Sequence, residues 1–308
     1  MPICVAGMHR SGTSMVARVL SHVGVSLGNE DDLMKPTPDN PEGYFEHLAF
    51  VGINERLLEL FGGRWDVPPE WPGGWLERPD VAELLMEART LTAQMAGDVW
   101  GWKDPRNSLT LPFWLAVVPD VQVVACVRHP LEVASSLQRR YGIARSDGVG
   151  LWVAYNQTLL NVVADTPLLV TAYERWLGHF DAELDRLVEF VGSSVDDEAR
   201  DAAAAAVHRE LRHNRASQDE AFELSPEALA LWSELSARAA QGCHDGDRSR
   251  QLRREVDAIW PALASRDAEI RDLQREVLAL HDRITQLHDA LQTAIGASEG
   301  DTVEEDSL

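Results

Sequence analysis

The apolar residues of this chain fall into short continuous runs and into longer stretches with helical spacing. The continuous runs predict buried strands, at 2–6, 99–102, 121–127 and 167–174. Apolar residues recurring every three or four positions predict helices, at 15–23, 49–60, 80–96, 152–163, 184–191 and 198–240. Apolar strands alternating with helices are typical of an α/β domain built on a parallel sheet.

A glycine-rich loop follows the first predicted strand, with the sequence G-M-H-R-S-G-T-S from Gly7 to Ser14. Two glycines let the backbone turn tightly, so its N–H groups and the start of the next helix can converge on an anion such as phosphate. The loop resembles the nucleotide-phosphate pattern G-x-x-x-x-G-K-[ST], except that Thr13 stands where that pattern has lysine. The cation comes earlier, as Arg10. A glycine turn that binds no ligand is the alternative interpretation.

Further candidate residues stand at the ends of later predicted strands. Lys103 directly follows the strand predicted at 99–102, and ligands bind at the carboxyl edge of a parallel sheet. Its alternative role is an ion pair with a carboxylate. Arg128 ends the strand at 121–127, and Ser136 follows eight residues later in a predicted helix that turns back towards the strand end. The planar guanidinium of arginine can bind two phosphate oxygens at once. The alternative interpretation of Ser136 is a hydroxyl on a helix face that binds no ligand.

Two loops separate these elements. Residues 29–47 are polar and rich in proline, and residues 62–79 are rich in tryptophan, glycine and proline. The tryptophans either line an acceptor pocket or pin a long loop to the core. We expect no regular structure in either loop.

The C-terminal part differs in pattern from the rest. We predict a main domain over 1–241, a linker over 242–252, a coiled-coil helix over 253–295 and an acidic, disordered tail over 296–308. The heptad at 270–291 has Ile or Val at a and Leu at d, which favours a parallel two-stranded coiled coil and hence a homodimer. Packing of this helix on its own domain is the alternative.

Composition and charge narrow the range of possible functions. The formal net charge of the 308-residue chain is −22, which argues against a nucleic-acid-binding surface. The three cysteines are widely spaced, so neither a disulfide framework nor a metal site is indicated. The sequence has no membrane-length apolar run and no evident signal peptide, and we expect a cytoplasmic protein.

Five motifs occur in an order that resembles a known family. They are the R-S-G-T-S loop, N-P-E-G-Y-F-E at 40–46, K-D-P-R at 103–106, R-H-P with Ser136, and Tyr-Glu at 173–174. Over residues 3–192 the chain resembles sulfotransferases that use 3′-phosphoadenosine 5′-phosphosulfate (PAPS), in a bacterial branch similar to carbohydrate and tyrosylprotein sulfotransferases. This resemblance implies a three-layer fold like that of P-loop NTPases, with a C-terminal helical extension.

The resemblance also implies roles for particular residues. The 5′-phosphosulfate is assigned to loop residues Arg10, Ser11, Gly12, Thr13 and Ser14. The 3′-phosphate is assigned to Arg128 and Ser136. Glu46 is the first choice for the base that deprotonates the acceptor, and Glu42 is the second. Lys103 is assigned to the oxygen that bridges the transferred group. PAPS is then the donor, no metal is needed, and the acceptor is a glycan, a glycolipid or a small natural product.

Two other functions fit parts of the pattern. A small-molecule kinase could share this fold, but it should carry the loop lysine and magnesium-binding acids. A non-catalytic, nucleotide-binding scaffold could act through the coiled coil. The presence of both Glu46 and Lys103 favours catalysis over a scaffold.

Overall fold

The computed structural model describes residues 1–37, 40, 43–95, 99–207 and 224–240. The chain divides into two units, and all the described residues belong to the first, Met1–Ser249. The predicted linker, coiled coil and acidic tail lie outside the described residues. Among the residues described, no helix is long and apolar enough to cross a membrane.

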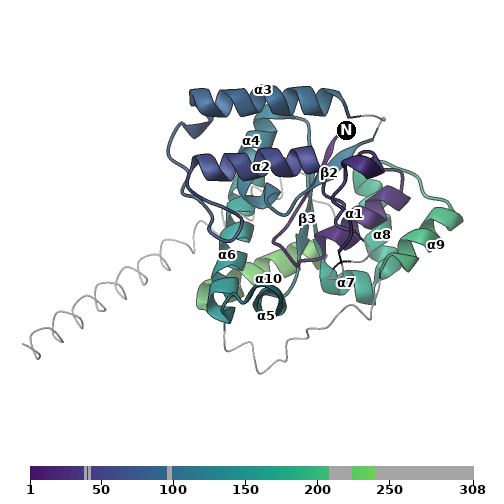
Figure 1. The fold of residues 1–308 in the computed structure, drawn as a ribbon. Helices are drawn as coiled ribbons and strands as arrows, with labels where there is room; N and C mark the ends of the chain where they lie inside the picture. Colours follow the sequence, from purple (N-terminus) through teal and green to yellow (C-terminus); the bar gives the residue numbers. More distant parts are fainter. Residues whose placement is uncertain (38–39, 41–42, 96–98, 208–223, 241–308) are drawn as a thin grey trace, which may run out of the picture. The chain divides into compact units, whose positions relative to one another are not determined.

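A parallel sheet lies at the centre of the described part (Figure 1). Its strands stand in the order β2-β1-β3-β4. Their bounds are Ile3–Ala6 for β1, Gly101–Lys103 for β2, Gln122–Val127 for β3 and Leu168–Ala172 for β4. Because β1 lies between β2 and β3, the residues that follow these three strands meet at one edge of the sheet. The predicted parallel sheet is confirmed.

Strand residues alternate between two apolar cores, one on each face of the sheet. In β1, Cys4 and Ala6 belong to one core, whereas Ile3 and Val5 belong to the other. Both faces are therefore covered, which explains why the strands have continuous apolar sequences rather than alternating ones. The predicted three-layer arrangement is confirmed.

Helices form the two outer layers (Figure 1). One face is covered by α1 (Thr13–His22), α8 (Phe180–Val191) and α9 (Asp197–Ala205). The opposite face is covered by α2 (Leu48–Leu60), α3 (Pro79–Ala93), α4 (Asn107–Val117), α5 (Pro130–Tyr141), α6 (Arg145–Val162) and α10 (Pro226–Ala240). The short helix α7 (Tyr173–Gly178) follows β4 directly. Single 3-10 turns form η1 (Glu30–Asp32), η2 (Trp75–Glu77) and η3 (Val163–Asp165).

Several elements differ from the sequence-based expectation. The pattern does not predict α4, because this helix is buried on nearly all sides and so lacks a polar stripe. The helix α6 begins at Arg145 rather than near Trp152. A Cβ on Gly148 would come 3.0 Å from Ala134 in α5, so this glycine allows close helix packing despite its low helix propensity.

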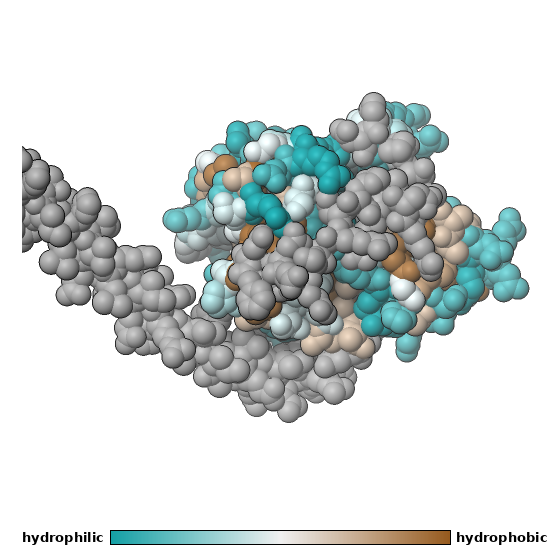
Figure 2. All heavy atoms as spheres, turned by 90° about the horizontal axis from the view of Figure 1, so that it is seen from below, coloured by the Kyte–Doolittle hydropathy of each residue, from teal (hydrophilic) through white to brown (hydrophobic). Residues whose placement is uncertain are grey.

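The boundaries of other elements also differ from the predicted ones. The strand expected over 167–174 ends at Ala172, and Tyr173 and Glu174 begin α7 instead. Within the helix expected over 198–240, the described residues form α9 and α10. The two loops expected to lack regular structure contain the single turns η1 and η2. Where the described residues are visible in Figure 2, hydrophilic residues and apolar patches lie side by side.

Candidate functional site

The loop between β1 and α1 depends on two glycines in the left-handed region. Gly7 has φ 136° and Gly12 has φ 90°. A Cβ would come 2.3 Å from the Cys126 carbonyl oxygen at Gly7, and 2.6 Å from the Tyr173 ring at Gly12. Only glycine fits at either position, so the loop can lie tightly between β3 and the start of α7.

The loop is also tied to α4 and presents free polar groups. The N–H of Gly7 donates to Ser108 Oγ at 2.9 Å. Ser11 Oγ is buried and has no hydrogen-bond partner among the described residues. The first turn of α1 holds only uncharged residues, and its N–H groups have no acceptor within the helix. A buried hydroxyl and free N–H groups at a helix start form a site suited to an anion.

Arg10, Arg128 and Ser136 meet beside this loop. Arg10 Nε donates to Ser136 Oγ at 3.0 Å, and Arg128 Nη1 donates to the Arg10 carbonyl oxygen at 3.4 Å. Arg128 also bonds Glu132 at 2.9 Å and lies over the Tyr173 ring at 4.4 Å. The sequence separates Arg10 from Ser136 by 126 positions, yet the structure brings them into direct contact.

Arg10 is the cation in this group that lacks a carboxylate partner within the described part of the chain. Burial lowers the pKa of Arg10, and the neighbouring guanidinium of Arg140 lowers it further. The backbone of Arg10 has φ 71°, a strained value for a side-chain-bearing residue. A half-buried guanidinium without a carboxylate partner in the described residues favours the binding of an anion at this corner of the site.

Lys103 and Glu46 form a buried ion pair on the other side of the loop. Lys103 Nζ lies 2.5 Å from Glu46 Oε1, and the two side chains are 1% and 7% exposed. The same ammonium donates to the Tyr44 carbonyl oxygen at 3.0 Å and to Ser14 Oγ at 3.2 Å. The ion pair considered as an alternative role for Lys103 is therefore present, and its partner is the predicted base.

Arg106 stands next to this pair. Its Nη1 lies 3.9 Å from Glu46 Oε2 and donates to Asp104 Oδ1 at 3.0 Å, while Nη2 donates to Glu55 at 2.8 Å. Burial opposes the charge of Arg106, but Asp104, Glu46 and Glu55 together raise its pKa above the ordinary value. Arg106 thus stays charged beside the predicted base.

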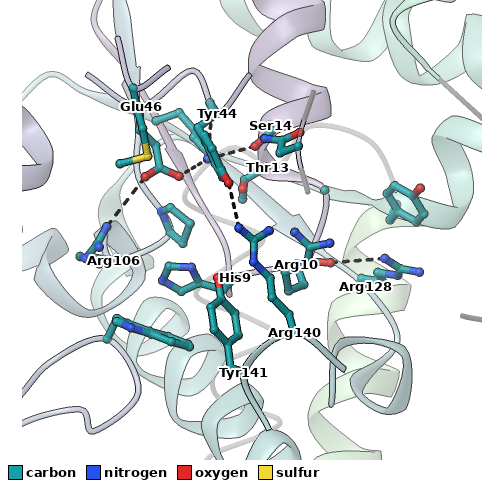
Figure 3. Close-up of a pocket in the computed structure, with 17 residues that line it drawn as sticks. His9, Arg10, Thr13, Ser14, Tyr44, Glu46, Arg106, Arg128, Arg140 and Tyr141 are labelled. Carbon is teal, nitrogen blue, oxygen red and sulfur yellow. Dashed lines mark hydrogen bonds and ion pairs between the residues drawn. The ribbon is translucent and has the colours of Figure 1, made fainter. Parts of the chain in front are cut away.

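These groups line one cavity of about 360 Å³ (Figure 3). The predicted site residues that line it are Arg10, Gly12, Thr13, Ser14, Glu46, Lys103 and Arg128. Ser136 reaches the same region through its bond to Arg10. Glu42 lies outside the described residues. Segments that follow β1, β2 and β3 thus contribute to a single site.

The structure adds cavity residues that sequence reasoning did not select. They are His9, Met34, Asn40, Tyr44, Trp65, Pro105, Arg106, Arg140, Tyr141 and Tyr173. Arg140 follows Ser136 by one helical turn on α5, and that spacing could have indicated it. It donates to the Tyr44 hydroxyl at 2.8 Å. Neighbouring motif letters could likewise have indicated Tyr44 and Arg106.

The tryptophans of the loop at 62–79 fall into two groups, one lining the pocket and the other fixing the loop. Trp65 lines the cavity and packs against the rings of His9 and Tyr141, with centroids 4.6 Å and 5.0 Å away. Trp71 and Trp75 instead stack on each other at 4.4 Å, and both contact Phe61. One tryptophan therefore serves the pocket and two pin the loop.

Comparisons with solved structures give distant matches. The sulfotransferase domain of the Synechococcus PCC 7002 olefin synthase is 16% identical, with 77% of this chain and 87% of that chain covered and a TM-score of 0.41. Sulfotransferase STF1 from Mycobacterium tuberculosis H37Rv is 16% identical, with 78% and 76% covered and a TM-score of 0.38. Mouse sulfotransferase SULT7A1, complexed with PAP, is 12% identical, with 82% and 88% covered and a TM-score of 0.38.

Comparisons of sequence decide the family. None of the curated proteins matches this chain. A family model described as the sulfotransferase family matches residues 2–197. This match spans the sheet, the loop and every described residue of the cavity, and it covers well over half of the chain. The chain belongs to the sulfotransferase family.

Proposed function

We propose that the chain transfers the sulfuryl group of PAPS to a hydroxyl, or an amine, of a glycan, a glycolipid or a small natural product. Membership of the sulfotransferase family makes it an enzyme of sulfuryl transfer. One observation carries the assignment of the site: three segments distant in sequence bring two anion-binding groups and a buried carboxylate into one cavity.

The residues present fit a donor with phosphate at both ends. Ser11 Oγ is buried without a partner, and the N–H groups at the start of α1 are free for a 5′-phosphosulfate. We assign this end to Arg10, Ser11, Gly12, Thr13 and Ser14. The 3′-phosphate is assigned to Arg128 and Ser136, whose hydroxyl already contacts Arg10. Arg10 thus lies where it can bind either anionic end, and its lack of a carboxylate in the described residues supports that use.

Glu46 is assigned as the base. The donor supplies a sulfuryl group whose bond to the phosphate breaks as a bond to the acceptor oxygen forms. Glu46 takes the proton that the acceptor loses, so charge balances across the step. Lys103 and Arg106 hold this carboxylate from two sides, at 2.5 Å and 3.9 Å. Glu46 is thereby fixed in orientation before the acceptor arrives.

Lys103 is assigned to stabilise negative charge on the departing oxygen. Its ammonium contacts both Glu46 and Ser14, so it links the base to the end of the phosphate loop. A fixed cation at that place lowers the barrier, because charge accumulates on the bridging oxygen in the transition state. The cations of the site supply the positive field, and the proposal uses no metal ion.

Calorimetry with the full chain tests the donor assignment. We expect 3′-phosphoadenosine 5′-phosphate (PAP) to bind well, and both 5′-AMP and ATP to bind poorly. Equal affinity for PAP and 5′-AMP would show that the 3′-phosphate is not recognised. Tight binding of ATP with magnesium would favour a kinase instead.

A further inference from the structure

One wall of the cavity is aromatic. This aromatic wall consists of His9, Trp65 and Tyr141. The His9 and Trp65 rings lie 4.6 Å apart at 49°, and the Trp65 and Tyr141 rings lie 5.0 Å apart at 56°. Tyr155 supports His9 edge-on from behind at 6.1 Å. None of these rings has a role in donor binding as assigned above.

His9 carries a polar atom without a partner. Its Nε2 is buried and makes no hydrogen bond to any described residue. Burial lowers the pKa of His9 well below the ordinary value, and the charges of Arg106 and Lys103 lower it further. The imidazole is therefore neutral near pH 7, able to accept or to donate a hydrogen bond. A buried polar atom left unpaired costs free energy that a ligand hydroxyl can recover.

His9, at one end of the aromatic wall, lies close to the cations that pair with Glu46. In the view of Figure 3, His9 lies between Arg106 and Arg10, with Tyr141 below it and Arg128 farther away. Arg106 and Lys103 both lower the pKa of His9, and they lie 3.9 Å and 2.5 Å from Glu46. A molecule whose hydroxyl reaches Glu46 would thus lie against this wall.

Resting on the proposed function, we propose that the aromatic wall binds a sugar ring of the acceptor. The ring packs on Trp65, and a hydroxyl next to the reacting one bonds to His9 Nε2. The negative face of an indole attracts the weakly positive C–H groups of a sugar. Apart from Gly12, the described lining residues whose side chains lack a polar group are Met34 and Pro105, and such a polar lining suits an acceptor rich in hydroxyl groups.

Sulfur-labelled PAPS tests the acceptor class. The full chain is incubated with three separate pools: methyl glycosides with short oligosaccharides, simple phenols, and steroid or long-chain alcohols. We expect labelled product in the sugar pool. Product confined to phenols or lipid alcohols, or no product in the sugar pool while PAP still binds, overturns the sugar assignment. If PAP does not bind to the wild-type chain, the proposed function itself fails.

Variants test the two contacts. His9→Phe keeps a ring on Trp65 but removes Nε2, and exposed His22→Phe on α1 is its control. We expect His9→Phe to raise KM for the sugar at least tenfold, with the Kd of PAP within twofold. With the His9→Phe variant, a sugar that lacks the neighbouring hydroxyl should then have the same KM as the complete sugar. An unchanged KM overturns the role of His9.

The stacking contact has a matched pair of variants in the same loop. Trp65→Phe should raise KM for the sugar, whereas Trp71→Phe should not, because Trp71 packs on Trp75 outside the cavity. Equal effects of the two changes overturn the stacking role. Should His9→Phe fail to fold, His9→Asn removes the Nε2 position in a smaller side chain, with the same expected rise in KM.

Discussion

The ammonium of Lys103 lies 2.5 Å from Oε1 of Glu46, although 57 positions separate the two residues. Both side chains are almost fully buried. Lys103 ends β2, whereas Glu46 belongs to the N-P-E-G-Y-F-E segment, whose Tyr44 carbonyl accepts from the same ammonium. The pair therefore ties this segment to the edge of the sheet.

Breaking this ion pair should destabilise the fold. Lys103→Met leaves Glu46 buried without its main partner, and Glu46→Gln does the same to Lys103. Each single change should lower the free energy of unfolding by about 3–5 kcal/mol, the usual cost of one uncompensated buried charge. The double variant should lose much less than the sum of the two. Urea denaturation measures all three, and additive losses would contradict the coupling.

Glu46→Gln should lower turnover by about two to four orders of magnitude, the usual contribution of a general base. PAP affinity should change little, because Glu46 is not assigned to the donor. Steady-state rates with labelled PAPS and calorimetry provide the two measurements. Glu59→Gln, an exposed change on α2, is the control. If Glu42→Gln abolishes turnover while Glu46→Gln remains active, Glu42 is the base instead.

Recognition of the 3′-phosphate should depend on Ser136 and on the guanidinium of Arg128. Ser136→Ala should weaken PAP binding by roughly threefold to tenfold, as loss of one hydrogen bond would. Arg128→Lys keeps the charge but loses the planar fork, so PAP should bind more weakly there too. Affinity for 5′-AMP should stay the same in both. The neighbouring Ser135→Ala is the matched control, and an equal loss there would argue for a general effect on α5.

Stability should fall as the pH decreases below the unfolded pKa of histidine, about 6.5. The folded state holds His9 neutral, since burial and nearby cations lower its pKa. Below that pH the unfolded chain binds a proton that the folded chain does not, so unfolding is favoured. His9→Gln should remove up to about 1 kcal/mol of this decrease between pH 6.5 and 5.5. Urea denaturation at each pH measures the free energy of unfolding of the wild type, of His9→Gln and of the control His22→Gln. If this free energy falls equally with decreasing pH in all three proteins, His9 is not involved.

The C-terminal heptad stays a prediction, because it lies outside the described residues. Its apolar seam favours a parallel dimer, so full-length protein should be dimeric by light scattering. Leu280→Asp with Leu287→Asp should break the dimer without changing PAP affinity. Gln286→Asp, away from the seam, should leave the dimer intact. A monomeric wild-type chain would support packing of this helix on its own domain.

The sequence by itself determined the class of fold and the family, and it selected seven residues that line one cavity in the structure. Continuous apolar runs indicate strands that are buried on both faces. The G-M-H-R-S-G-T-S loop after the first strand indicates a tight turn, which either binds an anion or has no ligand. The predicted strands and the sulfotransferase resemblance are confirmed. Local pattern suffices for these features, because each depends on residues close together in the chain.

Only the tertiary structure decided which polar groups meet. The strand order places β1 between β2 and β3, and this brings Lys103 and Arg128 to opposite sides of one loop. On either side of this loop, Lys103 contacts Glu46 and Arg10 contacts Ser136. Periodicity shows that a face is buried but not which buried partner it meets. For the same reason α4, buried on nearly every side, gives no periodic signal, and Trp65 cannot be told from Trp71 and Trp75 until the loop is folded.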